Sequence, residues 1–305
     1  MTTIGHVSDL HYWAFDKVNP LELLNKRLVG GVNIALNRAK KHDNKIATLA
    51  LKQLDELEVD HIAISGDLTN LAFNCEYEEA AREVFTIKNA EERVSIIPGN
   101  HDYYTADTVR EGRFEKTFST LLKSDLPEYI GADYYPYCRF VGKDVAVIGL
   151  NSGMVSPPFF ALGKVKLEEL RRLKKLLADP VLEKRFVIVQ VHHHLLPHTH
   201  KLEAMRKLVN AKEVLDILRF SKVDLVLHGH NHFSNIDVLP HLEGKGDIVI
   251  SGCSSSSYVG HEKKAHRATF NVYKVQKKTF SISRFIYNND LARFEAWDKQ
   301  SFPRT

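Results

Sequence analysis

The sequence predicts an α/β fold in which helices cover a sheet of largely buried strands. Short, continuous apolar runs recur along the chain, and such runs are typical of strands that are buried on both faces. Segments with helical periodicity lie between some of these runs. Near the C-terminus, two segments of alternating polarity are separated only by Gln276-Lys277-Lys278. Together these patterns favour a layered α/β fold whose last strands are antiparallel.

The apolar runs that predict buried strands each end in small or polar residues. They span residues 4–7, 61–64, 94–97, 145–150, 186–191, 223–227 and 248–250. The alternating segments at residues 268–275 and 279–287 predict a hairpin with a tight turn.

Two segments predict amphipathic helices. Between residues 46 and 57, apolar residues recur at spacings of three and four. The segment 164–177 has a stripe of leucines on one side and charged residues on the other. We expect the charged side of this second helix to be exposed.

The composition is that of an ordinary globular enzyme. Of the 305 residues, 44% are hydrophobic and 26% are charged, which excludes disordered, fibrous and disulfide-scaffold proteins. The net charge of +4 tolerates an anionic substrate but is too small to indicate nucleic-acid binding. We therefore expect no nucleic-acid partner.

Three observations favour a cytoplasmic location. The cysteines Cys75, Cys138 and Cys253 are odd in number and widely scattered, which is typical of free thiols in a reducing compartment. No stretch of 18 or more apolar residues exists that would span a membrane. Residues 1–4 also lack the basic and apolar pattern of a secretion signal.

We expect one domain over residues 1–305, because the chain shows no repeat and no linker. A long insertion at about residues 12–45 is apolar with interspersed basic residues. One interpretation is a helix that packs on the core with an exposed basic face. The other is a lid or interfacial helix that meets an anionic, lipid-bearing ligand at a membrane surface.

Five short motifs follow predicted strands, at the edge where open α/β sheets place their ligand sites. They offer carboxylate, imidazole and amide donors, which divalent metals accept. The motifs are Asp9-Leu10-His11, Gly66-Asp67-Leu68-Thr69-Asn70, Gly99-Asn100-His101-Asp102, His192-His193-His194 and Gly229-His230-Asn231-His232.

These donors suit two metal ions better than one. A carboxylate such as Asp67 can bridge two cations with its two oxygens. We assign one cation to Asp9, His11, Asp67 and His232, and the other to Asp67, Asn100, His192 and His230. Two such cations hold a hydroxide between them and clamp a phosphoryl group, so the pattern predicts phosphate-ester hydrolysis.

His101 is a candidate general acid. It follows the candidate ligand Asn100 directly, so we expect it beside the metals, where it donates to the phosphate or protonates the leaving oxygen. Asp102 is expected to hold the His101 ring through its second nitrogen.

The run His192-His193-His194 leaves the ligand open, because neighbouring side chains at a strand end point in different directions. We favour His192, with His193 as the alternative ligand or as a substrate contact. His198, in the loop after Pro197, is a further candidate substrate contact.

The five motifs, in this order, resemble the calcineurin-like metallophosphoesterase superfamily, and they span about three quarters of the chain. The resemblance implies that the seven residues assigned above are metal ligands and that His101 is the acid. It also implies a four-layer α/β/β/α sandwich with two stacked mixed sheets. One departure is Asn70, where many members have an acidic residue. We expect Asn70 to lie behind the ligands and count it among the candidate substrate contacts.

Two branches of the superfamily are compatible with the sequence. The motifs Ser8-Asp9-Leu10-His11 and His192 to Pro197 are similar to those of class III cyclic-nucleotide phosphodiesterases, and a gapless match puts the ligand at His192. The insertion at 12–45 is longer than expected there. The insertion offers an apolar surface. A UDP-2,3-diacylglucosamine pyrophosphohydrolase needs such a surface, because its substrate is lipid-linked.

Three functions follow from these alternatives. The first is a dinuclear phosphodiesterase for a cyclic nucleotide or related small phosphodiester, and the second is the lipid-linked pyrophosphohydrolase at a membrane surface. The third, a scaffold without catalysis, is disfavoured because every ligand position is filled. The donor set suits Mn, Fe or Zn without selecting among them, and the sequence does not determine the oligomeric state.

Overall fold

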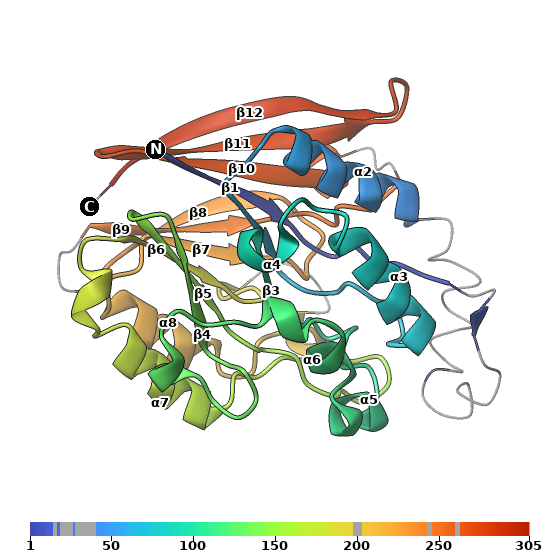
Figure 1. Cartoon of the computed structure of the whole chain (residues 1–305), viewed down its shortest axis with the longest axis horizontal. Coiled ribbons are helices and arrows are strands. Elements are labelled where there is room, and N and C mark those ends of the chain that lie inside the picture. Colours follow the sequence, from blue (N-terminus) through green and yellow to red (C-terminus); the bar gives the residue numbers. More distant parts are fainter. Residues whose placement is uncertain are drawn as a thin grey trace.

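The computed structural model describes residues 1–14, 17–18, 27, 41–197, 203–242, 246–259 and 263–304. These residues form two stacked six-stranded sheets with helices on their outer faces (Figure 1). The α/β class and the four-layer arrangement expected from the sequence are confirmed. Most of the insertion at 12–45, including its expected helix, lies outside the described residues, apart from Arg27 and the segments at its two ends.

The first sheet has the strand order β12-β11-β10-β1-β2-β3. β1 runs parallel to β2 and antiparallel to β10, so the sheet is mixed. Val7 pairs with Ile64 near the carboxyl ends of β1 and β2, which places the loops after both strands at the same edge. The strands are β1 (Thr2–Val7), β2 (His61–Ile64), β3 (Val94–Ile96), β10 (Thr269–Val275), β11 (Thr279–Asn288) and β12 (Arg293–Pro303).

The second sheet has the order β4-β5-β6-β7-β9-β8. Its four central strands are parallel, and the two outer strands, β4 and β8, are antiparallel to their neighbours. The strands are β4 (Tyr137–Val141), β5 (Val145–Gly149), β6 (Phe186–Gln190), β7 (Leu225–His228), β8 (Asn235–Pro240) and β9 (Asp247–Gly252).

Helices α2 and α3 cover the first sheet, and α7 and α8 cover the second (Figure 1). The charged face of α7 is exposed, as expected, and Arg171 and Glu168 form an ion pair on it. None of the described helices is long and apolar enough to cross a lipid bilayer. The helices are α2 (Asn44–Glu56), α3 (Asn74–Val84), α4 (Ala90–Arg93), α5 (Ala106–Glu111), α6 (Arg113–Thr117), α7 (Leu167–Leu176) and α8 (Ala211–Arg219).

An apolar layer fills the space between the two sheets. Ile4 and Ala63 of the first sheet pack in one cluster with Val147, Ile188 and Leu227 of the second. Further apolar layers lie between each sheet and its helices, so the central strands are buried on both faces. This double burial is the physical reason for the continuous apolar runs in the sequence.

Candidate metal centre

The five motifs meet at one edge of the sandwich. Asp9 and His11 follow β1, and Asp67 follows β2. The two loops are joined by backbone hydrogen bonds from Asp9 N to Gly66 O (2.9 Å) and from His11 N to Asp67 O (3.0 Å). His192 follows β6, and its carbonyl accepts from Gly229 N, at the end of β7 (3.1 Å). The carboxyl ends of parallel strands in both sheets therefore supply the site.

The backbone of these loops is held in an uncommon conformation. The residues with positive φ include Asp9 (52°), His11 (49°), Asp67 (54°), His230 (69°) and His232 (48°). A non-glycine residue in this region costs about 1 kcal/mol or more, so the surrounding packing must impose it. Gly99 and Gly229 allow the close approach, because a Cβ at either position would overlap Asp67 or Asp9.

Each site carboxylate uses one oxygen to hold a neighbouring loop. Asp9 Oδ2 accepts from His230 N (2.9 Å), and Asp67 Oδ1 accepts from His101 N (2.8 Å). Asp9 Oδ1 and Asp67 Oδ2 face the imidazoles instead. Only one Asp67 oxygen therefore faces the imidazoles, whereas the sequence had led us to expect a bridge through both.

The first group of donors contains Asp9, His11 and His232. His11 Nε2 and His232 Nε2 lie 3.1 Å apart, and His232 Nε2 lies 3.1 Å from Asp9 Oδ1. His11 Nε2 is also 3.8 Å from Asp9 Oδ1 and 4.0 Å from Asp67 Oδ2. In this structure the two imidazoles are linked by a hydrogen bond. Donor atoms this close together are also spaced as ligands that converge on one cation.

The second group contains Asp67, His192 and His230, whose donor atoms lie within 4.8 Å of one another. His192 Nε2 is 3.3 Å from Asp67 Oδ2, the same oxygen that approaches His11. Asn100 Oδ1 is buried without a hydrogen-bond partner, as an amide oxygen would be if its partner were a metal. Asp67 therefore belongs to both groups of donors.

Backbone carbonyls select the imidazole tautomers. His11 Nδ1 donates to Thr69 O (3.2 Å), and His192 Nδ1 donates to Ser65 O (2.7 Å), so in both rings Nε2 carries the lone pair. His230 Nε2 donates to Arg206 O (2.8 Å), which leaves the lone pair on Nδ1. A metal-bound histidine is usually oriented by a hydrogen bond of this kind from its other nitrogen. The residues present therefore fit divalent cations.

The electrostatics of the site favour ionised carboxylates. Burial by itself raises the pKa of Asp9, but the neighbouring His232 outweighs it and holds this pKa below its ordinary range. Asp67 is likewise buried, yet His192 and His101 lower its pKa. Burial, together with the charge of His193, lowers the pKa of His230 far below its ordinary value. Burial lowers the pKa of His192 as well, but Asp67 outweighs it and raises this pKa to about 9, so His192 must give up a proton when a metal binds.

His101 lies beside the first group, with its ring centre 4.9 Å from that of His11. Its Nδ1 donates to Asn70 O (2.5 Å), so the nitrogen that would gain and lose a proton in acid–base chemistry is Nε2. The expectation that Asp102 holds this ring is wrong. The Asp102 carboxylate instead accepts from the backbone nitrogens of Leu68 (3.0 Å) and Gly99 (2.9 Å), because these N–H groups point inward where the two loops meet. Asp102 is therefore a structural link between loops.

The candidate substrate contacts Asn70 and His193 lie directly beside the candidate metal ligands, and the His193 ring centre is 4.3 Å from that of His230. Asn70 lies behind the ligands, and its Nδ2 donates to His11 O (2.6 Å). His193 has no exposed surface, and its Nδ1 lies 2.8 Å from Ser152 Oγ. Both side chains are buried in this structure. His198 lies outside the described residues.

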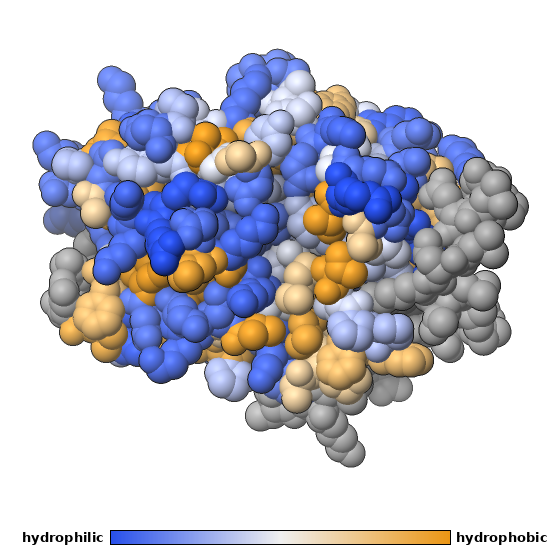
Figure 2. All heavy atoms as spheres, turned by 90° about the horizontal axis from the view of Figure 1, so that it is seen from below, coloured by the Kyte–Doolittle hydropathy of each residue, from blue (hydrophilic) through white to orange (hydrophobic). Residues whose placement is uncertain are grey.

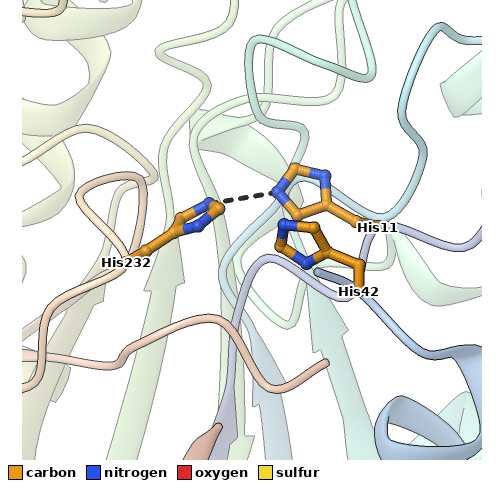
Figure 3. A group of neighbouring side chains, drawn as sticks. All are labelled: His11, His42 and His232. Carbon is orange, nitrogen blue, oxygen red and sulfur yellow. Dashed lines mark hydrogen bonds between the residues drawn. The ribbon is translucent and has the colours of Figure 1, made fainter. Parts of the chain in front are cut away.

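Two residues join the site without belonging to any motif. His42, from the end of the insertion, forms a group of imidazoles with His11 and His232 (Figure 3). The Arg206 guanidinium donates to His230 O (3.0 Å), and its charge acts on Asp9 and Asp67. His42 and Arg206 do not lie next to other candidate ligands in the sequence, so no motif indicated a role in metal or phosphate binding.

Comparisons with known proteins agree with this geometry. The family model described as calcineurin-like phosphoesterase matches residues 2–234. The chain is 27% identical over 181 residues to the 3',5'-cyclic adenosine monophosphate phosphodiesterase CpdA of Haemophilus influenzae. That match covers 59% of this chain and 57% of the relative, so it spans little more than half of the relative's length.

Among solved structures, the purple acid phosphatase PPD1 from yellow lupin (Lupinus luteus) seeds shares the fold. Its TM-score is 0.65 at 11% sequence identity. The superposition covers 99% of this chain and 54% of that structure.

Proposed function

Because the chain belongs to the calcineurin-like phosphoesterase family, we propose that it is a metal-dependent phosphoester hydrolase, which holds two divalent cations and cleaves a small phosphodiester, such as a cyclic nucleotide. The observation that carries this proposal is the position of Asp67. Its Oδ2 is 3.3 Å from His192 Nε2 and 4.0 Å from His11 Nε2, so one carboxylate serves both groups of donors.

The first group, Asp9, His11, Asp67 and His232, would hold one cation. The second, Asp67, Asn100, His192 and His230, would hold the other. The mixed nitrogen and oxygen donors, without thiolate, suit Mn, Fe or Zn. Such a pair supplies Lewis acidity, which lowers the pKa of water and polarises the phosphoryl oxygens.

The remaining chemistry belongs to two side chains. His101, oriented through Nδ1 by Asn70 O, is placed to give a proton from Nε2 to the leaving oxygen. The Arg206 guanidinium lies close enough for its charge to act on Asp9 and Asp67, which positions it to orient a phosphate oxygen.

A cavity of about 670 Å³ supports a small organic substrate. Its lining includes Tyr103, Gly153, Lys116 and Lys166. A Cβ on Gly153 would lie 3.0 Å from Gly99 O, so this end of the cavity adjoins the loop that carries Asn100 and His101. A nucleoside attached to a phosphate at the metal centre would have room here.

One observation favours the second candidate, a lipid-linked pyrophosphate. Phe159 and Phe160 are 82% and 40% exposed, in the same loop as Val155, which lines the cavity. Exposed aromatic side chains in a loop beside a cavity suit acyl chains or a membrane surface. The face seen in Figure 2, in contrast, is largely hydrophilic, with separate hydrophobic patches among the described residues.

The first experiment compares the hydrolysis of bis-p-nitrophenyl phosphate and p-nitrophenyl phosphate with added Mn²⁺ and with a chelator, beside Asp67→Ala. Metal-dependent diester cleavage that the variant loses by about 1,000-fold supports the proposal, since a metal centre supplies several kcal/mol. A variant that keeps two metals and wild-type turnover contradicts the role of Asp67.

The second experiment separates the two substrate classes. The purified protein is assayed with 3',5'-cyclic AMP and with UDP-2,3-diacylglucosamine, each with and without anionic vesicles. Vesicle-independent cleavage of the cyclic nucleotide favours the first candidate. If vesicles stimulate cleavage of the lipid, and this stimulated cleavage is lost in the Phe159→Ser variant, the second candidate is favoured.

A further inference from the structure

We infer that His42 is an additional ligand of the cation held by Asp9, His11 and His232, so that the end of the insertion at 12–45 completes this metal site. The inference rests on the proposed two-metal centre and adds to it a residue outside the five motifs.

The backbone around His42 is fixed against the site. The two ends of the insertion are joined, because Asn44 Nδ2 donates to Trp13 O (2.9 Å) and Trp13 N donates to Asn44 Oδ1 (3.3 Å). Asp43 N also donates to Ser257 O (2.9 Å), and Asp43 caps the N-terminus of α2. His42 therefore sits at a rigid junction rather than in the middle of a loop.

The imidazole of His42 packs directly on the first group of ligands. Its ring centre is 4.7 Å from that of His11 and 5.4 Å from that of His232. One nitrogen from each of the three rings lies within 4.8 Å of the other two. Figure 3 shows the three imidazoles turned toward a common point from separate segments of the chain. The His42 side chain is buried, with 6% of its surface exposed.

Two serine hydroxyls orient the ring. Ser255 Oγ and Ser257 Oγ donate to Asp9 O, at 2.7 and 3.3 Å. His42 Nδ1 in turn hydrogen-bonds to the same two hydroxyls, at 3.3 Å to Ser255 and 2.8 Å to Ser257. The ring is thus held through Nδ1, and a cation would be bound by the other nitrogen, Nε2.

The same hydroxyls thus bind the backbone of the ligand Asp9 and the ring of His42. Such a shared support is the usual way in which a protein fixes a metal-bound imidazole. A buried histidine with a role in packing alone would need the hydrogen bond to Ser257 but not a ring nitrogen within 4.8 Å of those of two other imidazoles. An added nitrogen donor would raise the affinity of this cation and favour a metal that accepts five or six ligands.

The test is a titration with Co²⁺ followed by visible d–d absorption, with the bound metal counted by mass spectrometry after gel filtration. The variants are His42→Ala and His42→Gln, the latter because its amide can still hydrogen-bond to Ser257. The control is His241→Gln, whose buried imidazole hydrogen-bonds to Arg219 O and Val223 O near the opposite end of β7.

We expect the wild-type protein and His241→Gln to bind two Co²⁺ ions with the same spectrum. Both His42 variants should bind one of the two ions about 10- to 100-fold more weakly, with altered d–d bands, and the other ion as before. Two ions bound by both His42 variants with unchanged affinity and spectrum would overturn the inference and leave the proposed function standing. A wild-type protein that binds fewer than two ions would instead contradict the proposed two-metal centre itself.

Discussion

His11 Nε2 and His232 Nε2 lie 3.1 Å apart, although the two residues are separated by 221 positions in the sequence. His11 follows β1 in the first sheet, and His232 follows β7 in the second. A cation shared by these nitrogens would join the two sheets at the edge where their parallel strands end. A metal bound by these residues would therefore also link the two halves of the sandwich.

Metal removal should destabilise the fold for this reason. A ligand that binds only the folded chain stabilises it by about 2.7 kcal/mol at 100 times its Kd. Urea unfolding of the Mn²⁺-loaded protein with and without EDTA should show a loss of this size. Asp67→Ala, which lacks the shared ligand, should respond much less to EDTA, and an equal response in both proteins would contradict the link.

His101→Ala should lower kcat by roughly 100- to 10,000-fold for substrates with poor leaving groups, since the leaving oxygen then lacks its proton donor. The loss should be small for bis-p-nitrophenyl phosphate, whose leaving group needs no proton. Metal content should not change, because the contact with Asp67 is made by the His101 backbone. An equal loss for good and poor leaving groups would assign His101 to phosphate binding instead.

Arg27→Ala should destabilise the protein by about 3 kcal/mol. The buried guanidinium donates to Leu71 O (2.8 Å) and Ala72 O (3.0 Å), and its loss leaves both carbonyls without these donors. Arg171→Ala, which removes an exposed ion pair with Glu168, is the matched control and should cost less than about 1 kcal/mol. Equal midpoints of urea unfolding in the two variants would show that the hydrogen bonds of Arg27 to Leu71 O and Ala72 O do not stabilise the fold.

Glu169→Gln should change the pH dependence of stability. Burial raises the pKa of Glu169 from 4.5 to about 8, although its carboxylate accepts from Asn151 N (2.8 Å). The neutral Glu169 carboxyl therefore contributes its full stabilisation of the fold below pH 4.5, and this stabilisation is lost as the pH rises through 8. The upper limit of this loss is about 5 kcal/mol.

The check is the free energy of unfolding of both proteins at pH 5 and pH 9. The free energy of unfolding should decrease less between pH 5 and pH 9 in Glu169→Gln than in the wild type, because the amide does not ionise. A variant that loses as much stability as the wild type over this range would show that Glu169 is already ionised at pH 5.

Much of the fold was predictable because its central strands are buried on both faces. The continuous run at 186–191 became β6 (Phe186–Gln190), and the leucine stripe after residue 164 became α7 (Leu167–Leu176). The strands β4, β8 and β12, which lie at sheet edges, were missed. β8 and β12 are only partly buried, so their side chains lack a clear apolar pattern. β4 is buried, but polar Arg139 interrupts its apolar run. Helices as short as α5 and α6 also carry too few turns for a periodicity to be recognised.

The sequence by itself determined which donors exist and that each follows a strand, since motifs such as Asp9-Leu10-His11 are local. Only the tertiary structure decided which nitrogen or oxygen of each donor faces the centre. Asp102 binds backbone N–H groups of its own loop and of the loop after β2 rather than His101. His42 packs against His11 and His232, while Ser255 and Ser257 hold its ring. His42 and Ser257 are 215 positions apart in the chain, so no local pattern specifies this contact, and only the folded structure brings the two residues together.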